Sequence, residues 1–106
     1  MLDDNRIAEL AKALSHPARV RIVRMLAAQS ECAGASIFSE LPLAQSTVSE
    51  HLRVLKSAGL VHGRSVGSAT VYCVESGPLS DLAAYIAHVA AETPSCSSAG
   101  KGGSCS

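Results

Sequence analysis

Apolar residues recur every three or four positions along most of the chain, and at roughly every second position in one later segment. The first spacing is typical of helices with one buried face, and the second of β-strands. The helical spacing predicts five helices, at residues 2–14, 15–28, 36–41, 45–58 and 79–92. The shorter spacing covers Val61–Val66 and Ala69–Val74, and Gly67-Ser68 between them suits a tight turn. We therefore expect a mainly α fold with a small β-hairpin.

Residues at the predicted helix ends support these limits. Ser15 is a good N-cap for the second helix, and Pro17 falls in its first turn, where a missing N–H does no harm. Gly59 suits the end of the fourth helix because glycine adopts the left-handed conformation of a C-terminal cap. Ala44, by contrast, stands where a Ser or Asp N-cap is expected. The stretch Glu75–Pro78 is predicted to be a linker before the last helix.

The third and fourth predicted helices are separated only by Pro42-Leu43-Ala44. Two helices joined this closely form a helix-turn-helix, in which the second helix lies in the major groove of DNA. Val48, Leu52 and Leu55 recur at helical spacing and give this second helix a core face. A hairpin directly after it is a wing, so the predicted fold class is a winged helix-turn-helix.

The free face of the fourth helix carries short hydroxyl and amide side chains followed by two cations. Such side chains suit contact with base edges and phosphates, and the wing offers further groups near its tip. The predicted DNA-binding residues are Gln45, Ser46, Thr47, Ser49, Arg53, Lys56, Arg64 and Ser68. Glu50 adds a negative charge to the same helix, so its direction relative to DNA affects affinity.

Composition limits what this fold belongs to. With 106 residues, 47 % of them hydrophobic, the chain is long enough for one domain with a modest core. We assign residues 1–92 to a DNA-binding and dimerisation domain and residues 93–106, rich in Ser and Gly, to a mobile tail. No apolar run is long enough to cross a bilayer, and Asp3 and Asp4 are unlike the basic start of a signal peptide. We therefore expect a cytoplasmic protein.

The formal net charge of zero argues against a nucleic-acid partner, but the distribution of charge reverses this impression. The central segment from Lys12 to Arg64 holds seven cations and three acids, a local balance of +4. A basic centre between acidic ends can follow phosphates, although less strongly than a domain that is basic throughout.

The last predicted helix has a broad apolar face for its length. This face comprises Leu79, Leu82, Ala83, Ile86, Val89 and Ala90. A single small domain has little surface on which to bury it. We therefore expect a two-fold homodimer that pairs through the N- and C-terminal helices.

Three segments together resemble the ArsR/SmtB family. They are the run Ala13 to Ile22, the run Leu41 to Val61 and the hairpin ending at Val71-Tyr72, and the resemblance covers roughly residues 5 to 90. It implies a bacterial homodimeric winged helix-turn-helix repressor that binds double-stranded operator DNA without a cofactor. The resemblance also implies release from DNA when a metal ion, a metalloid or a redox signal arrives.

Two inducer sites that the resemblance implies do not match this sequence. The helix before the recognition helix commonly carries a Cys-x-Cys pattern in the family, but here that region offers only Cys32. A zinc-type site on the last helix needs paired Asp and His residues, whereas Asp81, His88 and Glu92 lack the pairing. The four histidines, His16, His51, His62 and His88, are assigned to capping, packing or DNA contact and not to metal.

The four cysteines remain as candidate sensors. Cys73 lies in a predicted strand and is most simply a small buried hydrophobic residue. Cys96 and Cys105 lie in the tail, which offers no core to hide a thiol, so they are expected to be reactive or to bind metal. The predicted ligands are Cys96 and Cys105, with Cys32 or a thiol of the partner subunit as a third.

A site made only of sulfur selects thiophilic ions. Two or three thiolates satisfy trivalent arsenic or antimony, whereas zinc usually takes four ligands and often includes His. We therefore predict a repressor released by As(III), Sb(III) or an organoarsenical, whose binding orders the tail and shifts the population away from DNA.

Two alternatives keep the same fold and DNA-binding face. One is a thiol-redox or persulfide-sensing repressor, in which Cys32 or a tail cysteine forms a reversible disulfide. The other is a sensor of Cd, Pb or Zn. An enzyme is not expected, because the sequence offers no paired carboxylates, no nucleophile and base, and no Gly-rich phosphate loop.

Overall fold

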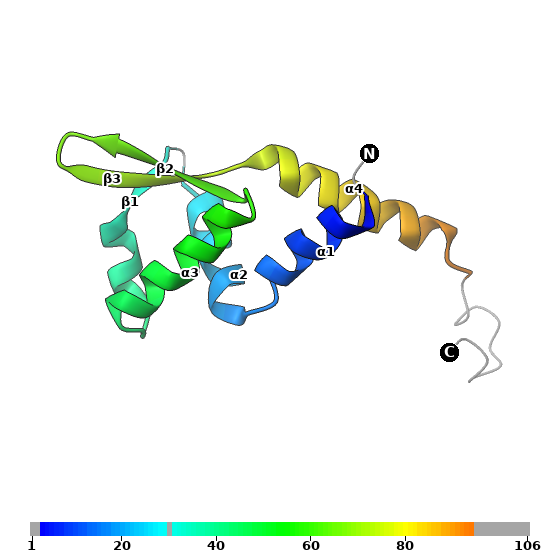
Figure 1. The fold of residues 1–106 in the computed structure, drawn as a ribbon, viewed down its shortest axis with the longest axis horizontal. Helices are drawn as coiled ribbons and strands as arrows, with labels where there is room; N and C mark the ends of the chain where they lie inside the picture. The colour runs from blue at the N-terminus through cyan, green and yellow to red at the C-terminus, as the bar shows by residue number, and fades with distance from the viewer. Residues whose placement is uncertain (1–2, 30, 95–106) are drawn as a thin grey trace.

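Helices and a small antiparallel sheet make up the fold in the computed structural model, which describes residues 3–29 and 31–94 (Figure 1). Most of the predicted tail, including Cys96 and Cys105, lies outside these residues. In chain order the elements are α1 (Asp4–Ala13), α2 (Pro17–Ala27), β1 (Ala33–Gly34), the 3-10 helix η1 (Ala35–Glu40), α3 (Gln45–Ser57), β2 (Val61–Val66), β3 (Ala69–Val74) and α4 (Ser76–Glu92).

The predicted fold class is confirmed, and the hairpin has the predicted limits. Val66 pairs with Ala69, and Gly67 between them has a φ of +62°, as two-residue hairpin turns require at their first position. The structure adds a third strand that the sequence pattern did not predict. β1 pairs with β3, so the strand order in the sheet is β1-β3-β2. Two residues are too few to show a period of two, so β1 has no signal in the sequence.

One hydrophobic core joins α1, α2, η1, α3 and the sheet. Leu10, Ile22, Leu55, Leu60 and Val61 are among its fully buried side chains. Burying a side chain of this size contributes about 1.5–3 kcal/mol. The predicted core residues of α3 (Val48, Leu52 and Leu55) are all buried, so the opposite face of α3 is turned to solvent.

Two of the predicted helix boundaries are wrong. His16 and not Ser15 is the N-cap of α2, because its Nδ1 accepts a hydrogen bond from the backbone N–H of Ala18 at 3.0 Å. The Ser15 hydroxyl instead donates to the carbonyl oxygen of Lys12 at 2.6 Å. The predicted linker is also mostly helical, since α4 begins at Ser76. Pro78 fits there because the N–H groups of a first helical turn have no intrahelical partner.

The C-terminal end of α3 is fixed by backbone bonds and by α1. Gly59 has a φ of +82°, as predicted, and the N–H of Leu60 donates to the carbonyl oxygen of Leu55 at 3.0 Å. Arg6 of α1 donates from Nη1 to the carbonyl oxygen of Ala58 at 2.8 Å. These contacts hold the orientation of α3 on the domain.

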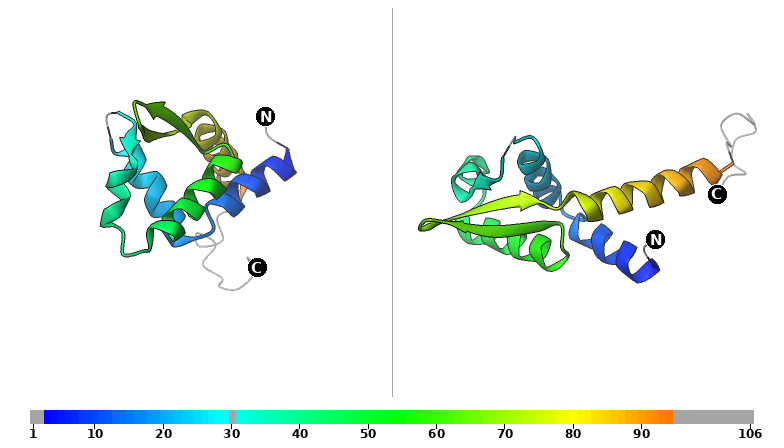
Figure 2. Two further views of the ribbon diagram at one scale, coloured as in Figure 1. Left: turned by 60° about the vertical axis from the view of Figure 1, so that its left-hand side comes forward. Right: turned by 90° about the horizontal axis from the view of Figure 1, so that it is seen from above.

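α4 follows β3 directly and extends away from the sheet, with α1 as its helical neighbour (Figures 1 and 2). Leu82 is its buried residue, whereas Tyr85, Ile86 and Val89 are 40 %, 56 % and 44 % exposed. Most of its predicted apolar face is therefore uncovered in a single chain. Among the described helices, none is long and apolar enough to span a membrane.

Candidate nucleic-acid interface and cysteine pair

All eight predicted DNA-binding side chains are exposed. Six lie on α3, from Gln45 to Lys56, and the other two, Arg64 and Ser68, lie on β2 and the hairpin turn. α3 packs beside β2, and a Cβ at Gly63 would lie 3.7 Å from the Nζ of Lys56. The fold therefore brings the end of the α3 cation stripe next to the strand that carries Arg64.

Arg53, one of the two cations on the outer face of α3, is paired with Glu50. Its Nε lies 3.1 Å from both carboxylate oxygens of Glu50, and its Nη2 donates to Oε2 as well. The hydrogen bond from Arg53 lowers the pKa of Glu50, and the same bond raises the pKa of Arg53. Both side chains remain exposed, so Glu50 lies on the solvent face of α3 and neutralises part of its positive charge.

His51 packs against His16 where α3 meets the start of α2. The ring centroids are 4.5 Å apart and the rings are tilted by 51°. Burial lowers the pKa of His51, and the positive charges of His16 and Arg19 lower it further. The other two histidines pair with acids, His62 with Glu75 at 2.7 Å and His88 with Glu92 at 3.2 Å. Within the described residues, no three His, Cys, Asp or Glu side chains gather as a metal site.

Cations from three helices surround a hollow of about 350 Å³ between α1, α2 and α3, a feature that the sequence did not reveal. Lys12, Arg19 and Arg53 line it together with Ser15, Ser57 and the acid Glu9. The Nε of Arg19 is buried and has no acceptor within the described chain. The three cations lie on different helices, which is why no local pattern in the sequence brings them together.

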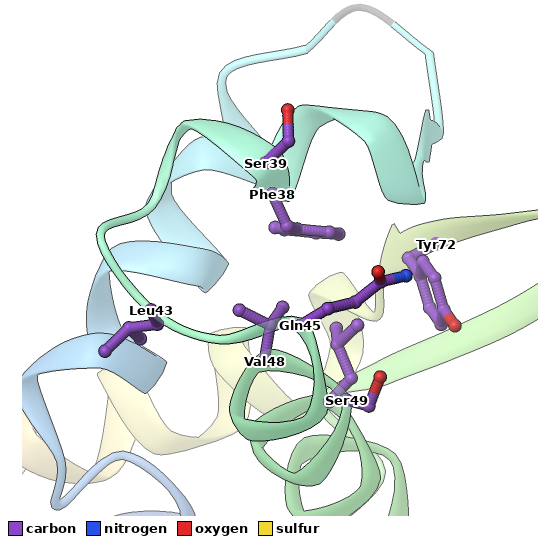
Figure 3. Close-up of a pocket in the computed structure, with 8 residues that line it drawn as sticks. Phe38, Ser39, Leu43, Gln45, Val48, Ser49 and Tyr72 are labelled. Carbon is purple, nitrogen blue, oxygen red and sulfur yellow. The ribbon is translucent and has the colours of Figure 1, made fainter.

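A second hollow of about 350 Å³ lies between η1, α3 and β3 (Figure 3). Phe38 and Tyr72 form one wall and meet edge to face, with ring centroids 6.1 Å apart. Gln45 of α3 extends across this hollow toward Tyr72, and Ser49 of the same helix also lines it. Two of the predicted DNA-binding side chains therefore stand at the rim of the hollow.

Cys32 and Cys73 form a disulfide bond. Ala33 pairs with Tyr72 across β1 and β3, so Cys32 stands opposite Cys73 one position further along, with a Cα–Cα distance of 4.6 Å. Cys73 is buried, as predicted, but its bond to Cys32 was missed because β1 was not foreseen. In this state Cys32 has no thiolate to offer an ion. The predicted ligands Cys96 and Cys105 lie outside the described residues.

The chain is similar to known bacterial regulators in sequence and in fold. The model of the bacterial regulatory protein arsR family matches residues 16–62, which include α2, η1 and α3. The uncharacterised HTH-type transcriptional regulator Rv0081 of Mycobacterium tuberculosis is 36% identical over 84 residues, 79% of this chain and 74% of that protein. The repressor SmtB of the same organism is 38% identical over 64 residues, 60% of this chain and 47% of that protein.

A solved structure has the same arrangement of elements. It is the homodimeric winged helix-turn-helix DNA-binding domain Mb0332 of Mycobacterium bovis, described as a possible ArsR-family transcriptional regulator. The TM-score is 0.64 at 29% sequence identity, over 83% of this chain and 81% of that one. The winged helix-turn-helix assignment therefore rests on the fold as well as on the sequence.

Proposed function

We propose that this chain, which belongs to the ArsR family of bacterial regulatory proteins, is a repressor that binds operator DNA. A thiophilic metalloid releases it from the DNA. The chain is a transcriptional regulator with a DNA-binding fold and not an enzyme. The proposal concerns the residues that contact DNA, the dimer and the identity of the inducer.

The observation that carries the DNA-binding part is the uninterrupted exposed polar face of α3 beside the wing. Gln45, Ser46 and Ser49 near the start of α3 suit contact with base edges, while Lys56 and Arg64 suit phosphates. Lys12, Arg19 and Arg53 line one hollow between α1, α2 and α3, in which three cations outnumber the single acid Glu9. We assign this hollow to the DNA backbone.

The functional unit that we propose is a homodimer formed through α1 and α4. The exposed side chains of Tyr85, Ile86 and Val89 supply an apolar surface, and a two-fold pair places two α3 helices on successive half-sites. The Mb0332 domain, which has a similar fold, is homodimeric, and this supports a homodimer here.

The proposed inducer is As(III), Sb(III) or an organoarsenical, because sulfur is the donor that such ions prefer. The tail from residue 93 to 106 carries Cys96 and Cys105, which are the candidate ligands together with Cys32. An ion binds Cys32 only after reduction of its bond to Cys73. Release follows if the ion binds the DNA-incompetent arrangement more tightly than the DNA-bound one.

The test is a fluorescence-polarisation titration of the DNA upstream of the protein's own gene with reduced protein. We expect saturable binding that weakens as salt increases, and release by arsenite or antimonite in preference to zinc, cadmium and peroxide. Release by zinc or peroxide alone would contradict the proposed inducer class. Undiminished release of the Cys96→Ser protein by arsenite would exclude the tail as the inducer site.

The DNA-binding face is tested separately in the absence of any ion. Lys56→Ala is expected to weaken operator binding roughly tenfold and to reduce the salt dependence, because one phosphate contact is lost. Arg24→Ala removes another exposed cation, from α2, and serves as the control. Equal effects of the two substitutions would argue against α3 as the DNA-contacting element.

A further inference from the structure

Backbone pairing next to the disulfide places Cys32 and Cys73 opposite each other. The pairs Ala33–Tyr72 and Gly34–Val71 fix the register of β1 on β3. The Cα–Cα distance of 4.6 Å agrees with the spacing of about 4.5 Å for directly opposed, non-hydrogen-bonded residues of antiparallel strands. Reduction of the bond therefore leaves two thiols on the same face of neighbouring strands.

The pair is accessible to a small solute. Cys32 and Cys73 both line a hollow of about 420 Å³, whose walls also include Glu31, Leu26 and Leu79. Cys32 is partly exposed, whereas Cys73 is 8 % exposed. Cys32 is therefore the more accessible residue of the pair.

We propose that the reduced Cys32–Cys73 pair is the metalloid site of this protein, a two-sulfur chelate within the winged domain. The inference rests on the proposed function and deepens it, because it moves the site from the tail to the junction of β1 and β3. It pairs Cys32 with Cys73, a residue that the sequence pattern had placed in the core.

The chemistry needs a reductant and then only a ligand exchange. Two low-molecular-weight thiols reduce the disulfide to two protein thiols and become one small disulfide. Arsenous acid then exchanges two hydroxyl groups for the two protein sulfurs, forms two As–S bonds and releases two water molecules. One hydroxyl group stays on arsenic and no electrons move in this second step.

The number of donors favours a metalloid over zinc. Two protein sulfurs and one hydroxyl group complete the pyramid of trivalent arsenic, whose lone pair occupies the remaining direction. Zinc in a structural site takes four ligands in a tetrahedron, so it would need two more donors than this pair supplies.

The position of the pair connects the DNA-binding face to the proposed dimer helix. Leu26 and Ala27 of α2, Val74 of β3, and Ser76 and Leu79 of α4 line the same hollow. Cys32 lies just before β1, which leads into η1 of the helix-turn-helix, and Cys73 lies in the wing. An ion held between them changes the packing at the point where the wing continues into α4, and this couples metalloid binding to DNA affinity.

The test compares two sets of cysteine variants of the full chain, each reduced before use. Cys96→Ser/Cys105→Ser keeps the pair and removes the tail thiols, whereas Cys32→Ser keeps the tail and breaks the pair. Arsenite uptake is measured by native mass spectrometry, and operator release by fluorescence polarisation. Cys73→Ala is a second variant that breaks the pair from its buried side. Thermal melts and operator affinity without arsenite check that each variant is folded.

We expect the tail variant to bind one arsenic atom per chain and to leave the operator like the wild type. Both pair variants are expected to lose at least tenfold in arsenite affinity. Unchanged uptake and release in Cys32→Ser and Cys73→Ala would overturn the inference and leave a tail site standing. Uptake at the pair without operator release would support the site and contradict the proposed inducer role instead.

Discussion

At the scale of single residues, the pair of Glu50 and Arg53 sets the charge of the proposed DNA-contacting face. Both side chains are exposed on α3, and the carboxylate holds the guanidinium along the helix. DNA binding therefore has either to break this pair or to bring a phosphate next to a carboxylate. If α3 contacts DNA as proposed, Glu50 opposes non-specific binding, and Arg53 is available to DNA only in competition with it.

Glu50→Gln is expected to increase operator affinity about three- to tenfold, because it frees Arg53 and removes a negative charge near the phosphates. The measurement is a polarisation titration at several salt concentrations. Glu92→Gln removes a similarly exposed carboxylate, paired with His88 on α4, and serves as the control. A loss of affinity in Glu50→Gln would instead indicate that Glu50 accepts a hydrogen bond from a cytosine amine.

His51 makes stability depend on pH below its ordinary pKa of 6.5. Burial and the nearby His16 and Arg19 lower its pKa from an ordinary value of 6.5, so the folded state binds fewer protons than the unfolded chain. The contribution of His51 to the free energy of unfolding is complete above its pKa in the unfolded chain. This contribution is lost as the pH falls toward its pKa in the folded state. Urea unfolding at pH 7.5 and pH 5.5 should show a smaller loss for His51→Gln than for the wild type. Equal losses would exclude His51 as the source.

At the scale of elements, α3 is fixed at its end and not at its start. Ala44 is the N-cap with an extended ψ of 147° and makes no side-chain capping bond, as the sequence suggested. The C-terminal end has the left-handed Gly59 and the contact between Arg6 and Ala58. The end of α3 next to the proposed base contacts is therefore the less restrained one.

Gly59→Ala is expected to destabilise the fold by more than about 1 kcal/mol. The alanine would need a positive φ, and its Cβ would lie 3.0 Å from the Nη2 of Arg6. Gly67→Ala separates the two causes, because Gly67 also has a positive φ but has nothing within 4 Å of its Cβ position. Urea denaturation measures both variants. Equal destabilisation would mean that the contact with Arg6 contributes nothing.

Ile86→Glu is expected to convert the proposed dimer to a monomer, because it places a charge within the exposed apolar face of α4. Sedimentation velocity measures the mass, and operator affinity should decrease with it. Ser80→Glu introduces the same charge at an exposed polar position of α4 and should leave the dimer intact. A dimeric Ile86→Glu protein would show that α4 is not the interface.

At the scale of the whole molecule, the bond between Cys32 and Cys73 joins residues 41 positions apart. Closing a loop of this length removes unfolded-state entropy worth about 4 kcal/mol in the chain-entropy model. We expect the reduced wild type to unfold at a lower urea concentration than the oxidised form. Its free energy of unfolding should be lower by up to about 4 kcal/mol. The Cys32→Ser protein should not respond to reductant, and a response there would trace the effect to another thiol.

The sequence by itself determined the recognition helix, the hairpin and the exposed face of α3. Val48, Leu52 and Leu55 have a helical period, Gly59 and Gly67 supply the positive φ values, and these local rules predicted the recognition helix and the wing. The six proposed DNA-binding residues of α3 followed from the same rules, because a helix that buries one stripe exposes the other, and Arg64 and Ser68 followed from the predicted hairpin. At the start of α2, both Ser15 and His16 can serve as the N-cap. N-cap preference favoured Ser15, whereas His16 makes the capping bond in the structure.

Only the tertiary structure decided which distant residues meet. Cys32 lies opposite Cys73 because β1 adds to the edge of β3, and a strand of two residues leaves no pattern along the chain. Likewise Lys12, Arg19 and Arg53 form one hollow because three helices pack together there. Periodicity and capping act over a few residues, whereas these contacts depend on packing between elements. The proposed base-contacting face could therefore be predicted from the sequence, and the proposed metalloid site could not.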